Sequence, residues 1–297
     1  MVSLSVVIPT FNRKEKLKRL LESLKQSTYT DFEIIVVDDA SSDETDALMR
    51  SSFSDVRYFR HNKIELVGKS RNDGILASAA NLVLMIDDDN TIDPHAIEIL
   101  MRFAQSNGDC GVIAPVTCFY DRPDVIMYAG SRFHRITKKT EFLHSGEDRS
   151  SVKGRTFETD GFANSFMLRR DLAIGAGLTT PKIPFSGEDG YLQLKIKKMG
   201  YRLVCIGDAL VFHDAPDNRM FMRATPFRLY YFMRGKLTFE RELDSGTGIL
   251  LFSAFIPAFF LWYFFTSMKG ENKLACMKSV ILGAFDGLFS RYPLRYV

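Results

Sequence analysis

The sequence contains little cysteine and no excess of charge of one sign. Its four cysteines, in 297 residues, include no Cys-x-x-Cys pair, so we expect no disulfide scaffold and a reducing compartment. The 39 basic and 36 acidic residues nearly cancel and give a net charge of +3. Because a nucleic-acid-binding domain shows a strongly basic face, we expect no nucleic acid partner.

Two common nucleotide-binding motifs and a secretory signal are also missing. Gly68-Lys69-Ser70 resembles the end of a Walker A loop, but Lys63 stands where that motif requires its first glycine. No Gly-x-Gly-x-x-Gly follows the first apolar run. Neither a charged segment nor a long apolar segment follows Met1. We therefore predict that the bulk of the chain folds in the cytoplasm.

Short apolar runs alternate with amphipathic stretches in the first half of the chain. Hydrophobic residues make up 46% of the sequence, which is enough for a sizeable core, and the length is typical of about two domains. The pattern predicts strands at 6–8, 32–37, 56–59 and 82–86, and helices at 17–24, 44–50, 69–80 and 94–106. Asn12 is the predicted N-cap of the first helix. This alternation indicates a parallel, doubly wound sheet, which binds ligands at the carboxyl ends of its strands.

The pattern changes after residue 110. Strands are predicted at 112–120, 125–133, 203–206 and 209–212, with a helix at 189–199 and a further apolar run at 162–168. Residues 134–155 are mostly polar or charged, which predicts a loop over or beside a site.

Three consecutive aspartates follow the predicted strand at 82–86. Neighbouring carboxylates raise each other's pKa unless a cation lies between them. A Mg2+ or Mn2+ ion, held by one or two carboxylates and by phosphate oxygens, would supply that cation. On an extended chain Asp87 and Asp89 point to one side while Asp88 points elsewhere. The alternative is a solvated acidic turn before the helix at 94–106.

Other polar residues stand at the ends of predicted strands or open a helix. Asp38 and Asp39 can accept hydrogen bonds from a ribose or a base, or can cap the next helix. Glu188 and Asp189 open a helix, whose dipole favours their charge, and one of them is a candidate general base. His213 ends a strand and is either a metal ligand or a surface residue.

A long uncharged segment lies near the C-terminus. Residues 245–268 carry no charge, and 249–265 are mostly apolar and aromatic. Roughly 20 apolar residues can span a bilayer, with Trp262 and Tyr263 at an interface. Pro257 would kink such a helix or turn it back as a re-entrant hairpin, and a buried core helix is the alternative. Residues 274–289 are amphipathic, as expected for a helix on a membrane surface.

Taken in order, these segments resemble the inverting family 2 glycosyltransferases of the GT-A fold over about residues 3–240. The segments that carry the resemblance are Val6 to Arg13, Val37 to Asp43, Gly68 to Gly74, Asp87 to Asp89, Gly187 to Asp189, Lys198 to Tyr201 and Val211 to His213. Several motifs in the same order are more specific than any one of them.

The resemblance implies a role for each matching residue. Those implied to bind the nucleotide are Thr10, Asp39, Arg71 and Asp88, those implied to hold Mg2+ or Mn2+ are Asp87, Asp89 and His213, and Asp189 is the implied catalytic base. Two positions depart from the family pattern. Tyr191 stands where the family often has an acidic residue, and Gly235 replaces the asparagine of a Tyr-Tyr-x-x-Arg-Asn segment.

We therefore predict a Rossmann-like, mixed but mainly parallel sheet flanked by helices, followed by a membrane-associated C-terminal region. The predicted catalytic domain covers 1–240, with a nucleotide-binding half at 1–110 and an acceptor half at 111–240, and the membrane-associated helices cover 245–297.

The predicted activity is metal-dependent, inverting transfer of a sugar from a UDP- or dTDP-linked donor. The acceptor is a hydroxyl of a glycan or glycolipid, lipid-linked and used in cell-surface glycan synthesis. The predicted location is the cytoplasmic side of the cell membrane, peripheral or single-pass. The alternatives are a polyprenyl-phosphate sugar transferase and a nucleotide-binding membrane protein without catalysis.

Overall fold

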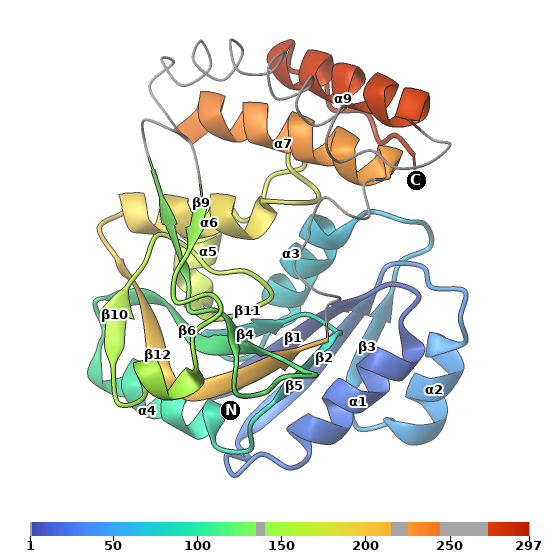
Figure 1. Ribbon diagram of the computed structural model, residues 1–297. Coiled ribbons are helices and arrows are strands. Elements are labelled where there is room, and N and C mark those ends of the chain that lie inside the picture. The colour runs from blue at the N-terminus through green and yellow to red at the C-terminus, as the bar shows by residue number, and fades with distance from the viewer. Residues whose placement is uncertain (1, 135–139, 215–224, 244–272, 297) are drawn as a thin grey trace.

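The computed structural model describes residues 2–134, 140–214, 225–243 and 273–296. It shows one large mixed sheet with helices on both faces (Figure 1). The two predicted halves of the catalytic domain share this sheet. Its strand order is β10 (Thr156–Glu158), β12 (Arg202–His213), β6 (Cys110–Phe119), β11 (Ser165–Arg169), β4 (Leu82–Ile86), β1 (Leu4–Thr10), β2 (Phe32–Asp38) and β3 (Arg57–Arg60).

The first half of the chain forms the parallel part of the sheet. Its strands are β1 (Leu4–Thr10), β2 (Phe32–Asp38), β3 (Arg57–Arg60) and β4 (Leu82–Ile86). The helices between them are α1 (Lys14–Leu24), α2 (Thr45–Ser52) and α3 (Val67–Ala77). β1 pairs in parallel with both β2 and β4, and β2 pairs in parallel with β3. The predicted alternation of strands and helices is confirmed here.

The second half makes the sheet mixed. Its long strands are β6 (Cys110–Phe119), β11 (Ser165–Arg169) and β12 (Arg202–His213). β11 lies antiparallel between β4 and β6, whereas β12 runs parallel to β6. The prediction of two strands at 203–206 and 209–212 is wrong, because β12 is continuous and absorbs the break as a register shift between Ile206 and Leu210.

Short elements line the edges of this second half. They are β5 (Asn90–Ile92), β7 (Ile126–Tyr128), β8 (Ser131–Phe133), β9 (Thr140–Phe142), the 3-10 helix η1 (Arg149–Val152) and β10 (Thr156–Glu158). The predicted loop at 134–155 therefore contains β9, which forms a hairpin with β8, and η1.

Two hydrophobic layers hold the helices on the sheet. α1 and α4 (Ala96–Ser106) pack on one face, and α3, α5 (Arg170–Gly175) and α6 (Glu188–Lys198) pack on the other. β1 contributes Val6 to the first layer and Val7 to the second, so its apolar residues run without interruption. A Cβ added to Gly74 of α3 would lie 2.1 Å from Val7 Cγ1. Glycine at this position therefore lets α3 approach β1 closely.

The predicted N-cap of α1 is wrong. The cap position is Arg13, without a side-chain cap hydrogen bond. Asn12 has a positive φ of 52°, and its Oδ1 instead accepts a hydrogen bond from the backbone N–H of Ser42 at 2.7 Å. Asparagine tolerates this left-handed conformation better than most residues, and the contact ties the end of β1 to the loop after β2.

Two helices at the C-terminal end of the chain lie side by side above α6 (Figure 1). They are α7 (Pro226–Leu243) and α9 (Lys273–Leu288). A Cβ on Gly283 of α9 would lie 2.4 Å from the carbonyl oxygen of Tyr230 on α7, so the backbones are in close contact. Among the described residues, no helix combines the length and apolar character needed to cross a bilayer. The apolar segment predicted at 249–265 lies outside the described residues.

Candidate active site

The three aspartates form a turn directly after β4. The backbone N–H of Asn90 donates to the carbonyl oxygen of Asp87 at 3.2 Å. Arg13 Nη1 donates to Asp88 Oδ1 at 2.9 Å and to Asp89 Oδ2 at 2.8 Å. Asp87 instead accepts from Arg71 Nη2 at 2.7 Å. The chain turns here, so the alternation of an extended strand, which placed Asp87 and Asp89 on one side, does not apply, and their joint role at a metal ion stays a prediction.

Asp89 and His213 meet as the resemblance implies. β5 pairs with β12 so that Asn90 lies opposite His213, and His213 Nε2 lies 3.1 Å from Asp89 Oδ1. Burial alone would raise the pKa of Asp89, but the hydrogen bond to His213 and the charges of His213 and Arg13 outweigh it and hold this pKa below its ordinary value.

The side chains of the aspartate turn and His213 can be compared with the ligands that a metal ion requires. Within the described ranges, no group of three or more His, Cys, Asp or Glu side chains is arranged to hold a metal. Mg2+, however, is usually bound through one or two carboxylates, with phosphate oxygens and water completing its shell. Asp89 supplies one such carboxylate, and the His213 nitrogen lies beside it. Both Asp87 and Asp89 also accept a hydrogen bond from an arginine, Arg71 and Arg13 respectively.

Arg71 joins this turn to the start of α6. Its buried guanidinium contacts Asp87, donates to Glu188 Oε1, and lies 3.7 Å from Asp189 Oδ2. Burial outweighs the attraction of Arg71 and raises the pKa of Glu188 to about 7, and burial also raises the pKa of Asp189. The Glu188 side chain is 5% exposed and that of Asp189 is 16% exposed. Asp189 is therefore the carboxylate of the pair that a substrate can reach.

Thr10 also lies in this group of contacts, because its hydroxyl donates to Asp88 Oδ2 at 2.7 Å. Burial raises the pKa of Asp88 to about 6, against the lowering effect of Arg13. Arg13 joins Thr10 and Asp88 to Asp89 and His213, so these residues form one connected set. Arg71, Asp87 and Asp189 form a second set. The two sets meet at the turn after β4.

Asp39 has a different environment. Its two oxygens accept hydrogen bonds from the backbone N–H groups of Glu65 and Leu66, each at 2.8 Å, and Oδ1 lies 2.8 Å from His61 Nδ1. The other ring nitrogen of His61 lies 2.9 Å from Asp73 Oδ2. The carboxylate of Asp39 therefore anchors the segment between β3 and α3, and its predicted contact with the nucleoside stays a prediction.

Sequence reasoning missed Arg13 and His61 as members of the site. Both follow the carboxyl end of a parallel strand, β1 and β3 respectively. The rule that placed the aspartates at this edge also applies to cationic and imidazole side chains, so strand ends were the available signal.

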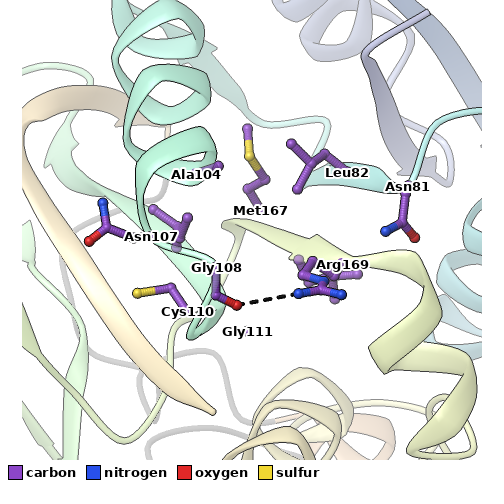
Figure 2. Close-up of a pocket in the computed structure, with 11 residues that line it drawn as sticks. Asn81, Leu82, Ala104, Asn107, Gly108, Cys110, Gly111, Met167 and Arg169 are labelled. Carbon is purple, nitrogen blue, oxygen red and sulfur yellow. Dashed lines mark hydrogen bonds between the residues drawn. The ribbon is translucent and has the colours of Figure 1, made fainter. Parts of the chain in front are cut away.

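A cavity of about 200 Å³ lies at the opposite edge of the sheet. Figure 2 shows it beside α4, near the beginning of β4 and β6, with Arg169 donating to the carbonyl oxygen of Gly108 at 3.3 Å. None of the predicted site residues lines it. Because ligands of such sheets bind at the carboxyl ends of the parallel strands, we assign the site to the aspartate edge.

Comparison with known proteins finds relatives in sequence and in fold. The chain is 32% identical over 119 residues to the GalNAc(5)-diNAcBac-PP-undecaprenol beta-1,3-glucosyltransferase of Campylobacter jejuni, a match that covers 37% of this chain and 38% of that relative. The fold is similar to the crystal structure of S. aureus TarS 1-349 in complex with UDP-GlcNAc, with a TM-score of 0.61, 17% identity, and coverage of 98% of this chain and 82% of that one.

A further similar structure is that of GalNAc-T7 with UDP, GalNAc and Mn2+, with a TM-score of 0.62, 16% identity, and coverage of 99% of this chain and 58% of that one. At these identities the two structures show the fold. The profile of glycosyl transferase family 2 matches residues 5–173, from β1 into α5. Because this match covers more than half of the 297 residues, the chain belongs to glycosyl transferase family 2.

Proposed function

We propose that this chain is a metal-dependent, inverting glycosyltransferase that moves a sugar from a UDP- or dTDP-linked donor to a hydroxyl group. The observation that carries the proposal is the guanidinium of Arg71, which contacts Asp87 of the aspartate turn at 2.7 Å and lies 3.7 Å from Asp189. It brings the candidate base next to the candidate diphosphate site. TarS and GalNAc-T7, whose folds are similar, were crystallised with UDP-GlcNAc and with UDP and Mn2+ respectively.

The reaction follows from this placement. Asp189 takes the proton of the acceptor hydroxyl as the oxygen bonds to C1 of the sugar, and the bond from C1 to the diphosphate breaks. A single displacement inverts the configuration at C1. When bound, Mg2+ or Mn2+ neutralises the charge of the leaving diphosphate, and Asp89 and His213 would hold it. Thr10 and Arg13 fix the carboxylates of the aspartate turn, and Arg71 holds Asp189 near that turn.

Donor and metal binding test the proposal together. We expect a UDP- or dTDP-sugar to bind with Mn2+ and to lose about tenfold or more in affinity when a chelator is added, because the ion would offset the charge of the diphosphate. His213→Ala should lose most of the Mn2+ dependence. His144→Ala is the matched control, since the ring of this histidine contacts the exposed Glu147 and packs against Phe157. Titration calorimetry with a panel of nucleotide sugars measures donor affinity, with Mn2+ and with chelator, for the original chain and for both variants. Equal affinity with Mn2+ and with chelator would refute metal dependence.

We further propose that the acceptor is a lipid-linked saccharide, used at the cytoplasmic side of the cell membrane. The apolar segment at 249–265 supports this location. So does the relative from Campylobacter jejuni, whose name includes an undecaprenol-linked saccharide.

The outer face of α9 offers a surface for this contact. Its apolar side chains Leu274, Ile281 and Phe285 are 41–77% exposed, as is that of Phe289 directly after the helix. The residues of the opposite face, which include Cys276, Val280, Gly283 and Gly287, are buried. Lys278 is exposed, whereas Asp286 is buried. An apolar face with basic residues favours an anionic lipid surface.

Replacing Ile281 and Phe285 together by Ser should weaken binding of the full chain to anionic vesicles by about tenfold or more, because membrane affinity scales with the apolar area buried. Leu76→Ser is the control, since Leu76 is an apolar residue of α3 that is 49% exposed. Vesicle flotation measures the effect. Substitution is preferable to deleting 245–297, which would remove α9 and uncover Arg234 on α7. Unchanged flotation would exclude this face as the lipid contact.

A further inference from the structure

Residues 180–191, here called the base loop, carry Asp189. The backbone of this loop adopts a conformation that contacts with other parts of the chain must stabilise. Ser186 and Gly187 have φ angles of 63° and 105°. Glycine adopts this left-handed region readily, but serine holds it only where neighbouring structure fixes the backbone. α6 begins at the next residue, Glu188. The direction in which Asp189 points therefore depends on this turn.

A single carboxylate of α7 joins the two ends of the base loop. Glu242 Oε1 accepts a hydrogen bond from Lys182 Nζ at 2.5 Å, and Glu242 Oε2 accepts one from the hydroxyl of Tyr191 at 2.6 Å. Lys182 precedes Asp189 in the chain and Tyr191 follows it. Burial alone would raise the pKa of Glu242, but these two hydrogen bonds and the charge of Lys182 outweigh it and lower this pKa, so the carboxylate is ionised.

α7 also contacts the middle of the base loop. A Cβ added to Gly235 would lie 3.2 Å from the carbonyl oxygen of Ser186 and 3.2 Å from Ile183 Cγ2. An asparagine at this position would therefore displace the backbone of the base loop at Ser186 or the side chain of Ile183. Phe185 packs edge-on against Phe227 of α7, with ring centroids 4.9 Å apart. Tyr191 and Gly235, which both depart from the family pattern, thus belong to one contact between α7 and the base loop.

We propose that Glu242 is a positioning residue for Asp189, which it orients toward the acceptor by holding Lys182 and Tyr191. This inference rests on the proposed role of Asp189 as the base. It assigns the orientation of the base to α7, a helix that lies beyond the residues matched by the family profile.

The test compares three variants of the full chain. Glu242→Leu should lower kcat about 10- to 100-fold with little change in KM for the donor, because displacing a reacting group by about 1 Å can cost on the order of 100-fold in rate. Glu242→Gln keeps an acceptor for Tyr191 and should recover a large part of that loss. Glu98→Ala removes a carboxylate that pairs with Arg102 on α4, away from the base loop, and should leave kcat unchanged.

A double-mutant cycle separates positioning from general destabilisation. Tyr191→Phe and Glu242→Leu should be non-additive in kcat, because both break the same contact. Additive effects, or a lowered melting temperature with kcat of the folded protein unchanged, would overturn the inference. If Asp189→Asn does not reduce turnover, the proposed function itself fails. If Asp189→Asn abolishes turnover while Glu242→Leu keeps full kcat, only the positioning role fails.

Discussion

Replacing Asp189 by Asn is expected to lower kcat by about three orders of magnitude while leaving donor affinity within twofold of the original. General base catalysis contributes roughly 10²- to 10⁴-fold, and the amide cannot accept the proton of the acceptor hydroxyl. The substitution preserves size, and the amide oxygen of asparagine can still accept the hydrogen bond that the Asp189 carboxylate accepts from the backbone N–H of Gly190. Donor affinity should persist because the aspartate turn is untouched.

The pH dependence of kcat/KM gives this substitution a second readout. The base must be ionised to work, and burial raises the pKa of Asp189 above its ordinary value. The rate of the original chain should therefore fall on the acid side at a higher pH than an exposed aspartate would give. Asp189→Asn should lose that acid limb together with most of the rate.

Asp171→Asn is the matched control, because Asp171 occupies the first turn of α5 as Asp189 does that of α6, and its side chain is 50% exposed. Single-turnover assays with a hydroxyl acceptor, and calorimetry for the donor, measure both variants. A small loss of rate in Asp189→Asn would favour a phosphate acceptor, which needs no deprotonation by this residue. Donor binding without any turnover by the original chain would favour a non-catalytic nucleotide-binding protein.

The first half of the fold could be predicted from sequence because β1, β2 and β4 contain apolar runs and because α1 and α4 are amphipathic. β4 begins and ends where the apolar run does. The antiparallel insertion of β11 between β4 and β6 could not be predicted. An apolar run shows that a strand is buried, but its direction depends on where the rest of the chain places it.

The candidate site was predicted at the level of residue type, and less well at the level of contacts. Order along the chain was enough to select Asp89 and His213, which the pairing of β5 with β12 brings together. The contact of Arg13 with Asp88 and Asp89 was not foreseen, because a long cationic side chain can reach any of several neighbouring carboxylates. Glu242 carried no sequence signal, since its partners lie on segments far away in the chain.

Replacing Arg71 by Met is expected to destabilise the chain by about 3–5 kcal/mol, the cost of removing one partner from a buried ion pair. Its guanidinium is the cation that contacts Asp87, Glu188 and Asp189. Without it, the three carboxylates would face one another with little solvent. Lys69→Met on the same helix is the control. Lys69 is 52% exposed and pairs with Asp73, so its loss should cost less than about 1 kcal/mol.

The loss of unfolding free energy caused by Arg71→Met should increase as the pH rises. Glu188, which faces Arg71, Asp189 and Asp87, has a pKa raised by burial to about 7 even with the guanidinium present. Removing Arg71 raises this pKa further, so Glu188 stays protonated up to a higher pH. At low pH the variant therefore buries fewer negative charges that lack a cation. A carboxyl whose pKa is higher in the folded than in the unfolded chain destabilises the fold as pH rises above the unfolded pKa. The destabilisation should therefore be largest above about pH 7 and smaller at pH 5.

Urea unfolding of Arg71→Met, followed by circular dichroism above pH 7 and at pH 5, measures this difference. A cost that does not change with pH, or that is no larger than that of Lys69→Met, would show that the guanidinium does not compensate buried charge at the base.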